Sequence, residues 1–149
     1  MGWIRLTAND AGLTSLYFRD PEPGIESNPN HPVIAQTVEQ LNEWFAGART
    51  EFDLPLNMQG TEFQLRVWNT LLEIPFGKTW SYLDLALRMG DRNATRAVGS
   101  ANGKNPISLI VPCHSVIGSN GKLTGYGGGI ERKKWLLEFE NALYQPELF

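Results

Sequence analysis

The chain contains a single cysteine, Cys113, and a histidine, His114, follows it directly. The thiolate is the reactive form of cysteine, and only a few per cent of an ordinary thiol is ionised at neutral pH, so a nucleophilic cysteine needs a neighbouring base or positive charge. His114 could be that base. Taken alone, a single cysteine is more often a small buried hydrophobic residue. The pair therefore predicts a nucleophilic site only if the surrounding sequence supports one.

Positive charge gathers around this pair, although the whole chain has a net charge of −3. Between residues 88 and 134, eight basic side chains stand against two acidic ones, Asp91 and Glu131, so this stretch carries +6. The basic residues are Arg88, Arg92, Arg96, Lys104, Lys122, Arg132, Lys133 and Lys134. Such a field should lower the pKa of the thiol and attract a polyanion. A solvated basic face is the alternative, and charge alone leaves it open.

The composition is that of a soluble globular protein of 149 residues, 42% of them hydrophobic. No apolar run approaches the roughly 20 residues that span a bilayer, and the first residues lack the layout of a signal peptide. One cysteine cannot form an internal disulfide, and two histidines with one cysteine make a poor zinc site. We therefore expect a cytoplasmic protein with no metal, no cofactor and no membrane association.

The first part of the chain has the pattern of a β-hairpin followed by a helix. Residues 3–7 and 13–18 alternate around a turn signal at 9–12, which predicts the hairpin. Pro32 suits the first turn of a helix that Gly47 should end, and His31 is expected to start this helix rather than bind a ligand. The expected apolar face is Ile34, Val38, Leu41 and Phe45, and Phe52, Leu54 and Leu56 alternate as a further strand.

The second part is predicted to be mostly helical. Thr61 and Gln64 have capping-box spacing before a helix whose buried face should be Phe63, Val67, Trp68, Leu71 and Leu72. Ser81 should cap a helix over 82–89 that Gly90 ends, and Asn93 should cap another over 94–102 that Gly103 ends. Two such helices predict a helix-turn-helix. Small residues in the second helix favour close approach to a DNA groove without reading sequence.

Around the cysteine, residues 107–111 have the apolar character of a buried strand, and residues 118–129 form a loop with six glycines. A last helix should run from Ile130 to about Leu143. Glu140 lies four residues after Leu136 and three before Leu143, on the apolar side of this helix, where a carboxylate needs a partner. A surface glutamate at the edge of the apolar stripe is the alternative.

Seven short motifs then follow one another between residues 60 and 140. They are Gly60-Thr61-Glu62-Phe63-Gln64 with Val67-Trp68, Ile74-Pro75-Phe76-Gly77, Ser81-Tyr82, Arg96-Ala97-Val98-Gly99, Asn105-Pro106, Pro112-Cys113-His114 and Thr124-Gly125-Tyr126-Gly127-Gly128. In this order the chain resembles the O6-alkylguanine-DNA alkyltransferases. The resemblance implies an α+β fold, with a non-catalytic, ribonuclease H-like α/β domain over residues 1–56 and a winged helix-turn-helix domain that binds DNA and carries catalysis over residues 57–149.

The resemblance also implies a reaction and a set of catalytic residues. Cys113 would accept an alkyl group from O6-alkylguanine, or O4-alkylthymine, in one irreversible turnover. His114 would act as its base through a water, because neighbours in an extended segment point apart, and Glu140 would orient His114. Asn105 would hold the active-site turn. Tyr82 would assist flipping of the base and donate a hydrogen bond to the leaving guanine.

The remaining implied residues contact DNA or the flipped base. Arg96 would fill the space left by the flipped nucleotide, from a helix in the minor groove; the other DNA contacts would be Tyr82, Thr95, Ala97 and Gly99. Val116, Tyr126 and Gly127 would line the base pocket, together with the backbone of Cys113. The implied partner is double-stranded DNA containing O6-alkylguanine, bound by a monomer that can act cooperatively along DNA.

Two positions depart from the family pattern. Ser115 stands where most members have arginine, which removes a positive charge beside the thiol, and Gly127 stands where some have serine. The zinc site of some members is absent.

Three other classes of protein share some of these features. An alkyltransferase-like protein would bind the lesion without transfer, but such proteins lack the cysteine. A Cys-His hydrolase with Glu140 as the orienting residue would not need a helix-turn-helix. A plain DNA-binding regulator would need longer side chains on its recognition helix.

Overall fold

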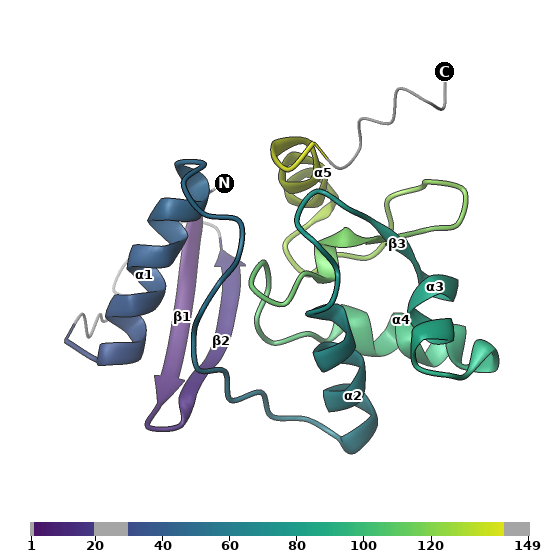
Figure 1. Cartoon of the computed structure of the whole chain (residues 1–149), viewed down its shortest axis with the longest axis horizontal. Coiled ribbons are helices and arrows are strands. Elements are labelled where there is room, and N and C mark those ends of the chain that lie inside the picture. Colours follow the sequence, from purple (N-terminus) through teal and green to yellow (C-terminus); the bar gives the residue numbers. More distant parts are fainter. Residues whose placement is uncertain (1, 20–29, 142–149) are drawn as a thin grey trace.

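The computed structural model describes residues 2–19 and 30–141, which form two parts lying side by side (Figure 1). The amino-terminal part holds the antiparallel hairpin β1 (Trp3–Asn9) and β2 (Gly12–Arg19), with helix α1 (Pro32–Phe45) packed against it. The predicted hairpin and helix are confirmed. His31 caps α1 by accepting a hydrogen bond from the Val33 backbone N–H at 3.2 Å, so its role is the structural one expected.

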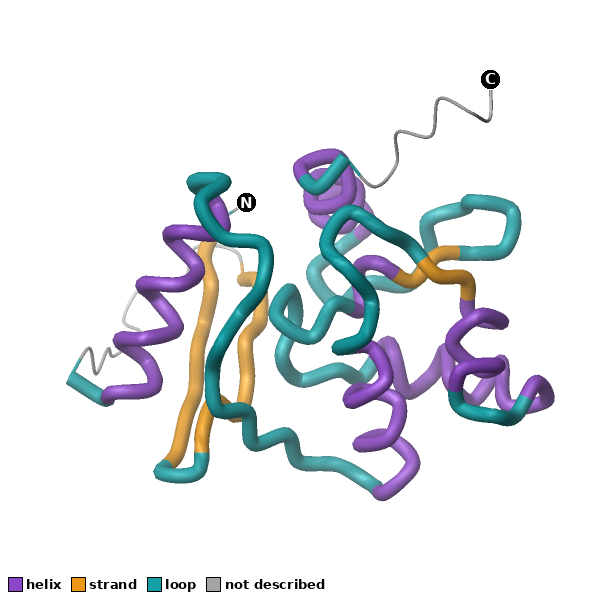
Figure 2. Tube along the Cα trace, in the orientation of Figure 1, coloured by secondary structure: helices purple, strands orange, loops and turns teal. Residues whose placement is uncertain are grey.

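The second part contains four helices around two short strands. Its elements are α2 (Glu62–Leu71), β3 (Trp80–Ser81), α3 (Tyr82–Arg88), the 3₁₀ turn η1 (Arg92–Ala94), α4 (Thr95–Gly103), the 3₁₀ turn η2 (Cys113–Ser115), β4 (Val116–Ile117) and α5 (Ile130–Phe139). The β3 and β4 strands pair in parallel. Figure 2 shows that long loops connect these elements. The α+β fold with a helix-turn-helix, α3 and α4, is confirmed.

Local capping explains where α2 and α3 begin. Thr61 accepts a hydrogen bond from the Gln64 backbone N–H at 3.1 Å, and the Gln64 side chain accepts one from the Thr61 N–H at 3.0 Å. Ser81 and Asp84 form the same reciprocal pair, with both distances 2.9 Å. Each box satisfies two N–H groups that a helix start leaves without partners. The predicted capping box at Thr61 and the predicted cap at Ser81 are therefore confirmed, and the structure adds Asp84 as the partner of Ser81.

The start of α4 differs from the prediction. Asn93 does not cap it; the Asp91 side chain accepts a hydrogen bond from the Asn93 N–H at 3.0 Å and starts the 3₁₀ turn η1, which leads into α4. The helix also includes Gly103, its last residue, and Lys104 is its C-cap. Asp91 takes the capping role because the first turn is a 3₁₀ turn that begins at Arg92, and the N-cap is the residue directly before the first helical one.

The buried face of α1 was predicted in part, and the strand at 52–56 was wrongly predicted. Leu41 is buried and Ile34 and Phe45 pack against the core as expected, whereas Val38 is 44% exposed. The other buried residues of the helix are Thr37, Gln40 and Trp44. The Gln40 side chain accepts from the Asp53 N–H at 2.8 Å and donates to the Asp53 carbonyl at 2.9 Å. The Gln40 amide therefore makes the hydrogen bonds that a neighbouring strand would otherwise make with Asp53. This explains why a polar residue is buried on α1. Instead of a paired strand, residues 52–56 form one isolated β-bridge, between Leu56 and Leu13.

Residues 107–111 form a buried turn and not the predicted strand. Ile107 bridges to Leu16, but Leu109 has a φ of 71° and reverses the chain. The Asn105 side chain accepts from the Ile107 N–H at 3.0 Å and donates to the Val111 carbonyl at 2.8 Å. The apolar sequence signalled burial correctly. Because the amide of Asn105 satisfies these backbone groups, burial did not require a strand.

Two helix ends also differ from the prediction. Helix α5 ends at Phe139, with Glu140 as its C-cap and Asn141 at a φ of 61°; Leu143 lies outside the described residues. At the end of α2, Val67, Trp68 and Leu71 are buried as predicted, but Leu72 follows the helix and is 44% exposed.

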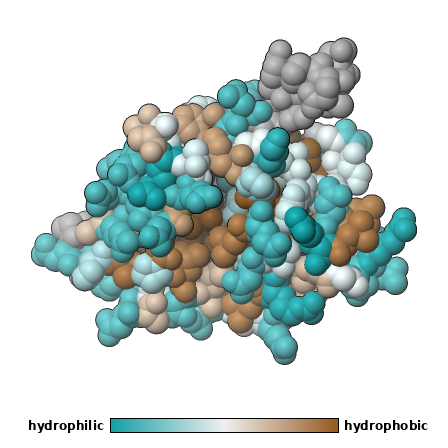
Figure 3. All heavy atoms as spheres, in the orientation of Figure 1, coloured by the Kyte–Doolittle hydropathy of each residue, from teal (hydrophilic) through white to brown (hydrophobic). Residues whose placement is uncertain are grey.

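The core lies where the two parts meet. Its fully buried apolar side chains include Leu13 and Leu16 from β2, Val67 and Leu71 from α2, Leu85 from α3, Val98 from α4, Ile107, Val111, Val116 and Leu136. On the face in Figure 3, apolar side chains also reach the surface near the middle of the molecule, between hydrophilic flanks. Within the described residues, no helix has the length and apolar character that crossing a membrane requires.

Candidate active site

Cys113 lies in the 3₁₀ turn η2, between the buried turn at 107–111 and strand β4. Its side chain is buried, and its N–H donates to the Val111 carbonyl at 2.7 Å. Its own carbonyl accepts from the Val116 N–H and, at 3.4 Å, from the Asn102 side chain. These bonds hold the backbone on both sides of the sulfur, so the position of the thiol is set by the tertiary structure.

Burial raises the pKa of the Cys113 thiol from 9.0 to about 11, because the thiolate loses its hydration. The Asn105 amide and the charge of Lys133 lower this pKa, but burial outweighs them. The expectation that the basic stretch lowers the pKa is wrong in its net direction. Arg88, Arg92 and Lys104 are exposed to solvent, which screens their charges. The resting thiol is therefore protonated, and ionising it requires a base.

His114 and Glu140 form a buried pair. Nε2 of His114 lies 2.7 Å from Oε2 of Glu140, and the two side chains are 1% and 5% exposed. The other carboxylate oxygen of Glu140 accepts from the Gly77 N–H at 2.9 Å. Gly77 has a φ of 81°, and a Cβ at this position would lie 3.1 Å from the Glu140 carbonyl oxygen. The turn whose N–H bonds Glu140 therefore favours glycine at position 77. Glu140 has the partner its position required, and the surface alternative is excluded.

The tautomer of His114 follows from this pair. An ionised carboxylate only accepts hydrogen bonds, so Nε2 carries the hydrogen and Nδ1 has a free lone pair. Among the described residues, no hydrogen-bond partner reaches Nδ1 although it is buried. His114 and Cys113 belong to one 3₁₀ turn and not to the extended segment expected. The ring of His114 therefore has a carboxylate at one nitrogen and keeps the other, Nδ1, as a buried base without a partner.

Two asparagines, one at the end of α4 and one just beyond it, hold the backbone around Cys113. Asn105, expected to hold the turn, bonds Ile107 and Val111. Asn102, which the sequence reasoning missed, is 2% exposed and reaches the Cys113 carbonyl. Its position three residues before Asn105 was the available signal. Helix α4 is thus directly bonded to the backbone of Cys113.

Lys133 is a second residue that the sequence reasoning missed. It is fully buried in α5, and its ammonium group donates to the Val116 carbonyl at 2.6 Å and the Thr124 carbonyl at 2.8 Å. Burial lowers its pKa from 10.5 to about 8, partly offset by the charge of Cys113. Its spacing of three and four residues from Leu136 and Leu137 could have revealed it. Lys133 ties the glycine-rich loop to β4 and puts a positive charge near the thiol.

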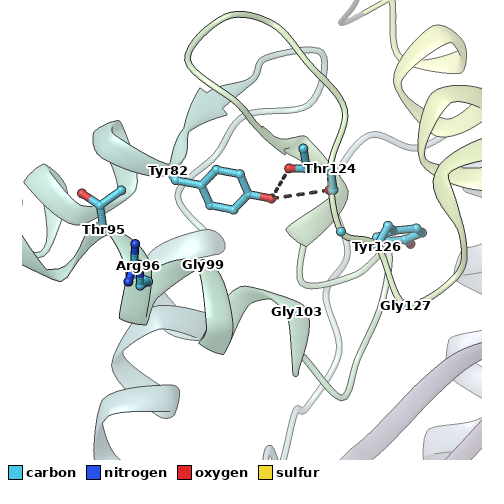
Figure 4. Close-up of a pocket in the computed structure, with 9 residues that line it drawn as sticks. Tyr82, Thr95, Arg96, Gly99, Gly103, Thr124, Tyr126 and Gly127 are labelled. Atoms are coloured by element: carbon cyan, nitrogen blue, oxygen red, sulfur yellow. Dashed lines mark hydrogen bonds between the residues drawn. The ribbon is translucent and has the colours of Figure 1, made fainter.

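A pocket of about 810 Å³ lies between α3, α4 and the glycine-rich loop (Figure 4). Six residues expected to contact DNA or the base line it: Tyr82, Thr95, Arg96, Gly99, Tyr126 and Gly127. Gly103, Thr124 and Gly125 line it as well; they were not among the expected contacts, although Thr124 and Gly125 belong to the last of the seven motifs. This volume lies within the range of small-molecule sites and can hold a nucleobase.

Three of the expected contacts lie outside this pocket. Ala97 is exposed on α4, Val116 is buried with its carbonyl bonded to Lys133, and Cys113 does not line the pocket. Tyr126 lines the pocket and also lies near the His114–Glu140 pair, since its ring centroid is 6.4 Å from that of His114. Burial, and then the nearby Cys113, raise the pKa of its phenol well above the usual value, so the phenol stays neutral.

A separate cleft of about 500 Å³ lies on the other side of the reactive pair, between the two parts of the chain. His114, Ser115 and Glu140 line it, and no residue lines both cavities. Ser115 is 1% exposed. The side chain at 115 therefore borders the inter-domain cleft and not the pocket with Arg96. Within the described part of the chain, no three His, Cys, Asp or Glu side chains are grouped so as to hold a metal ion.

Comparison with known proteins agrees with this geometry. The family model described as the DNA-binding domain of 6-O-methylguanine DNA methyltransferase matches residues 62–142, and the one described as its ribonuclease-like domain matches residues 1–58. A methylated-DNA–protein-cysteine methyltransferase of Mycobacterium bovis is 56% identical over 99% of this chain and 92% of its own length. One from Methanosarcina acetivorans is 44% identical over 95% and 94%. The crystal structure of Mycobacterium tuberculosis OGT in complex with DNA superimposes with a TM-score of 0.81 and 48% identity, covering 97% of this chain and 90% of that one.

Proposed function

The chain belongs to the 6-O-methylguanine DNA methyltransferase family, and from this premise we propose that Cys113 takes the methyl group of O6-methylguanine in DNA. The protein is a methylated-DNA–protein-cysteine methyltransferase that repairs DNA by alkyl transfer. The observation that carries the residue assignment is the buried His114–Glu140 pair beside the single thiol. A protonated thiol with a pKa of about 11 cannot react well without such a base.

The transfer is a displacement at the methyl carbon. A bond forms between Sγ of Cys113 and that carbon, while the bond from the carbon to O6 of guanine breaks. The thiol proton passes to His114, directly or through a water, and Glu140 stabilises the imidazolium by its 2.7 Å contact. Tyr82 donates a hydrogen bond to the guanine as it gains charge. The thioether cannot be reversed by thiol exchange, so each molecule acts once.

DNA reaches the site through the pocket of α3, α4 and the glycine-rich loop. A guanine inside a duplex must be flipped out before its O6 can meet a side chain, at a cost of a few kcal/mol. Arg96, exposed on α4 at the edge of the pocket, fills the vacated space from the minor groove. Because Cys113 does not line the pocket, movement of the loop around Tyr126 accompanies entry of the base.

Several finer properties belong to the same proposal. Residues 1–56 form the amino-terminal domain and residues 57–149 the catalytic one. The protein acts as a monomer in the cytoplasm, can bind cooperatively along DNA, and also accepts O4-alkylthymine. No cofactor takes part in the displacement, because the thiol itself is the acceptor.

Intact-protein mass spectrometry after incubation with a duplex containing O6-methylguanine tests this function. We expect one methyl group per protein, located on Cys113, and none on Cys113→Ala, which should still bind DNA. Methyl transfer beyond one group per protein, or to another residue, would refute the assignment. Repeated hydrolysis of an ester substrate without stable modification would favour a Cys-His hydrolase instead.

A further inference from the structure

The hydroxyl groups of Tyr82 and Thr124 lie 3.1 Å apart (Figure 4). Tyr82 is the first residue of α3, and Thr124 belongs to the glycine-rich loop, so this contact joins two walls of the base pocket. The Tyr82 hydroxyl also lies 3.5 Å from the Thr124 carbonyl, which it can reach as a donor. Thr124 is therefore the residue that contacts the polar end of Tyr82.

Either hydroxyl can be the donor across the 3.1 Å contact, because each carries one hydrogen and can also accept one. The Thr124 carbonyl, which can only accept, makes one of these arrangements use every group: Tyr82 donates to this carbonyl, and the Thr124 hydroxyl donates to the Tyr82 oxygen. The hydrogen of Tyr82 is left in a contact of 3.5 Å, at the weak end of the hydrogen-bond range. It is therefore easily given up to a better acceptor.

Both partners are held in place from other directions. The Thr124 carbonyl accepts from the buried ammonium of Lys133 at 2.8 Å, so it stays satisfied when Tyr82 turns its hydrogen elsewhere. The ring of Tyr82 packs over Gly99 of α4, where a Cβ would lie 3.5 Å from the ring. The tyrosine is thus fixed through its ring by the recognition helix and through its oxygen by the loop.

We propose that Thr124 is a positioning residue for alkyl transfer, which presents the hydroxyl of Tyr82 to the flipped base by donating a hydrogen bond to its oxygen. The inference rests on the role of Tyr82 in the proposed function. When guanine enters, the Tyr82 hydrogen moves from the weak contact to the base, and the Thr124 hydroxyl continues to donate. As Tyr82 donates to the increasingly negative guanine, its oxygen gains negative charge, and the Thr124 donor stabilises that charge.

The test is a double-mutant cycle on single-turnover methyl transfer from a duplex containing O6-methylguanine. Thr124→Val removes the hydroxyl at nearly constant shape, and Thr124→Ser keeps it. We expect Thr124→Val to react about fivefold more slowly, the rate ratio of one ordinary hydrogen bond, and Thr124→Ser to react like the wild type. In a Tyr82→Phe background, Thr124→Val should have no further effect, because the oxygen it serves is gone.

Controls separate this role from a structural one. Thr70→Val makes the same chemical change on α2, where the hydroxyl only bonds the Arg66 carbonyl of its own helix, and should leave the rate unchanged. Thermal unfolding and DNA affinity are measured for each variant. Thr124→Ala compared with Thr124→Ser repeats the test without a branched side chain.

The outcomes are distinct. Equal rates for Thr124→Val and the wild type, or an equal loss with and without the Tyr82 hydroxyl, would overturn the role of Thr124 while leaving the proposed function intact. A wild-type protein that takes no methyl group on Cys113 would refute the proposed function itself.

Discussion

Replacing Glu140 by glutamine tests the reactive pair most directly. The substitution keeps the shape of the side chain and removes its charge. Oε2 of Glu140 lies 2.7 Å from Nε2 of His114, and Oε1 accepts from the Gly77 N–H at 2.9 Å. A glutamine can keep the Gly77 bond with its oxygen, but its NH₂ group then faces a ring nitrogen that also carries hydrogen. The variant should therefore make His114 a weaker base.

The size of the effect follows from the burial of the pair. Both side chains are less than a tenth exposed, so solvent screens their interaction little. A hydrogen bond to a charged group contributes about 1.5–3 kcal/mol, and if this is lost when the imidazolium forms, transfer slows about 10- to 100-fold. DNA affinity should not change, because Glu140 lines the inter-domain cleft and not the pocket with Arg96.

The pH profile adds a second criterion. Because the thiol pKa is about 11, each unit by which the pH increases toward this value raises the ionised fraction of Cys113 about tenfold. Solvent hydroxide can then replace the lost base, so the rate of Glu140→Gln should recover as the pH rises from about 7 to about 9. The wild type should gain less over the same range. The assay is single-turnover methyl transfer from duplex DNA.

Glu138→Gln on the exposed side of α5 is the matched control, because it also removes one carboxylate charge. The Glu138 carboxylate lies 4.0 Å from the Lys134 ammonium, and both side chains are exposed to solvent. Its rate should equal that of the wild type. Unfolding midpoints show whether Glu140→Gln remains folded. A folded Glu140→Gln variant with a wild-type rate, or one whose loss is the same at every pH, would refute the base role of the pair.

Three further predictions concern the loop, the DNA face and the cleft. Lys133→Met should slow methyl transfer and speed hydrogen exchange in residues 118–129, because Lys133 bonds the Thr124 carbonyl. A lysine whose pKa is lowered in the folded state makes the protein more stable as the pH rises above about 8, and the variant should lose this rise. Urea unfolding at two pH values measures it, and a rise that persists in the variant would contradict the prediction. Arg96→Ala should slow repair of duplex DNA far more than reaction with free O6-benzylguanine, and equal losses would make Arg96 structural. Ser115→Arg should leave DNA affinity and its salt dependence unchanged, because its side chain borders the cleft, and a steeper salt dependence by fluorescence anisotropy would contradict this.

Features that depend on neighbours in the chain could be predicted from the sequence. The capping boxes at Thr61 and Ser81 join groups three residues apart, and the spacing alone indicates them. The place of Glu140 on the apolar side of the last helix was compatible with burial but left a surface position open, and the structure buries it. The hairpin and the helix-turn-helix were accessible from neighbours in the chain, whereas the pairing of His114 with Glu140 was an implication of the family resemblance.

Other features were decided by contacts between distant segments. The side-chain amides of Gln40 and Asn105 satisfy backbone groups of residues 52–56 and 107–111. These two apolar stretches have the sequence pattern of strands, but neither forms one. Periodicity reports which residues avoid water, but it does not report which group completes their hydrogen bonds.

The electrostatics of the site also required the tertiary structure. Counting charges along the sequence predicted a lowered thiol pKa, yet burial raises it, because desolvation of Cys113 outweighs the Asn105 hydrogen bond and the charge of Lys133. Linear spacing likewise placed Ser115 beside the thiol without showing that its side chain borders a different cavity. The sequence by itself determined which groups can react and which helices surround them. Packing decided their protonation, because the energy of a charge depends on everything that replaces water around it.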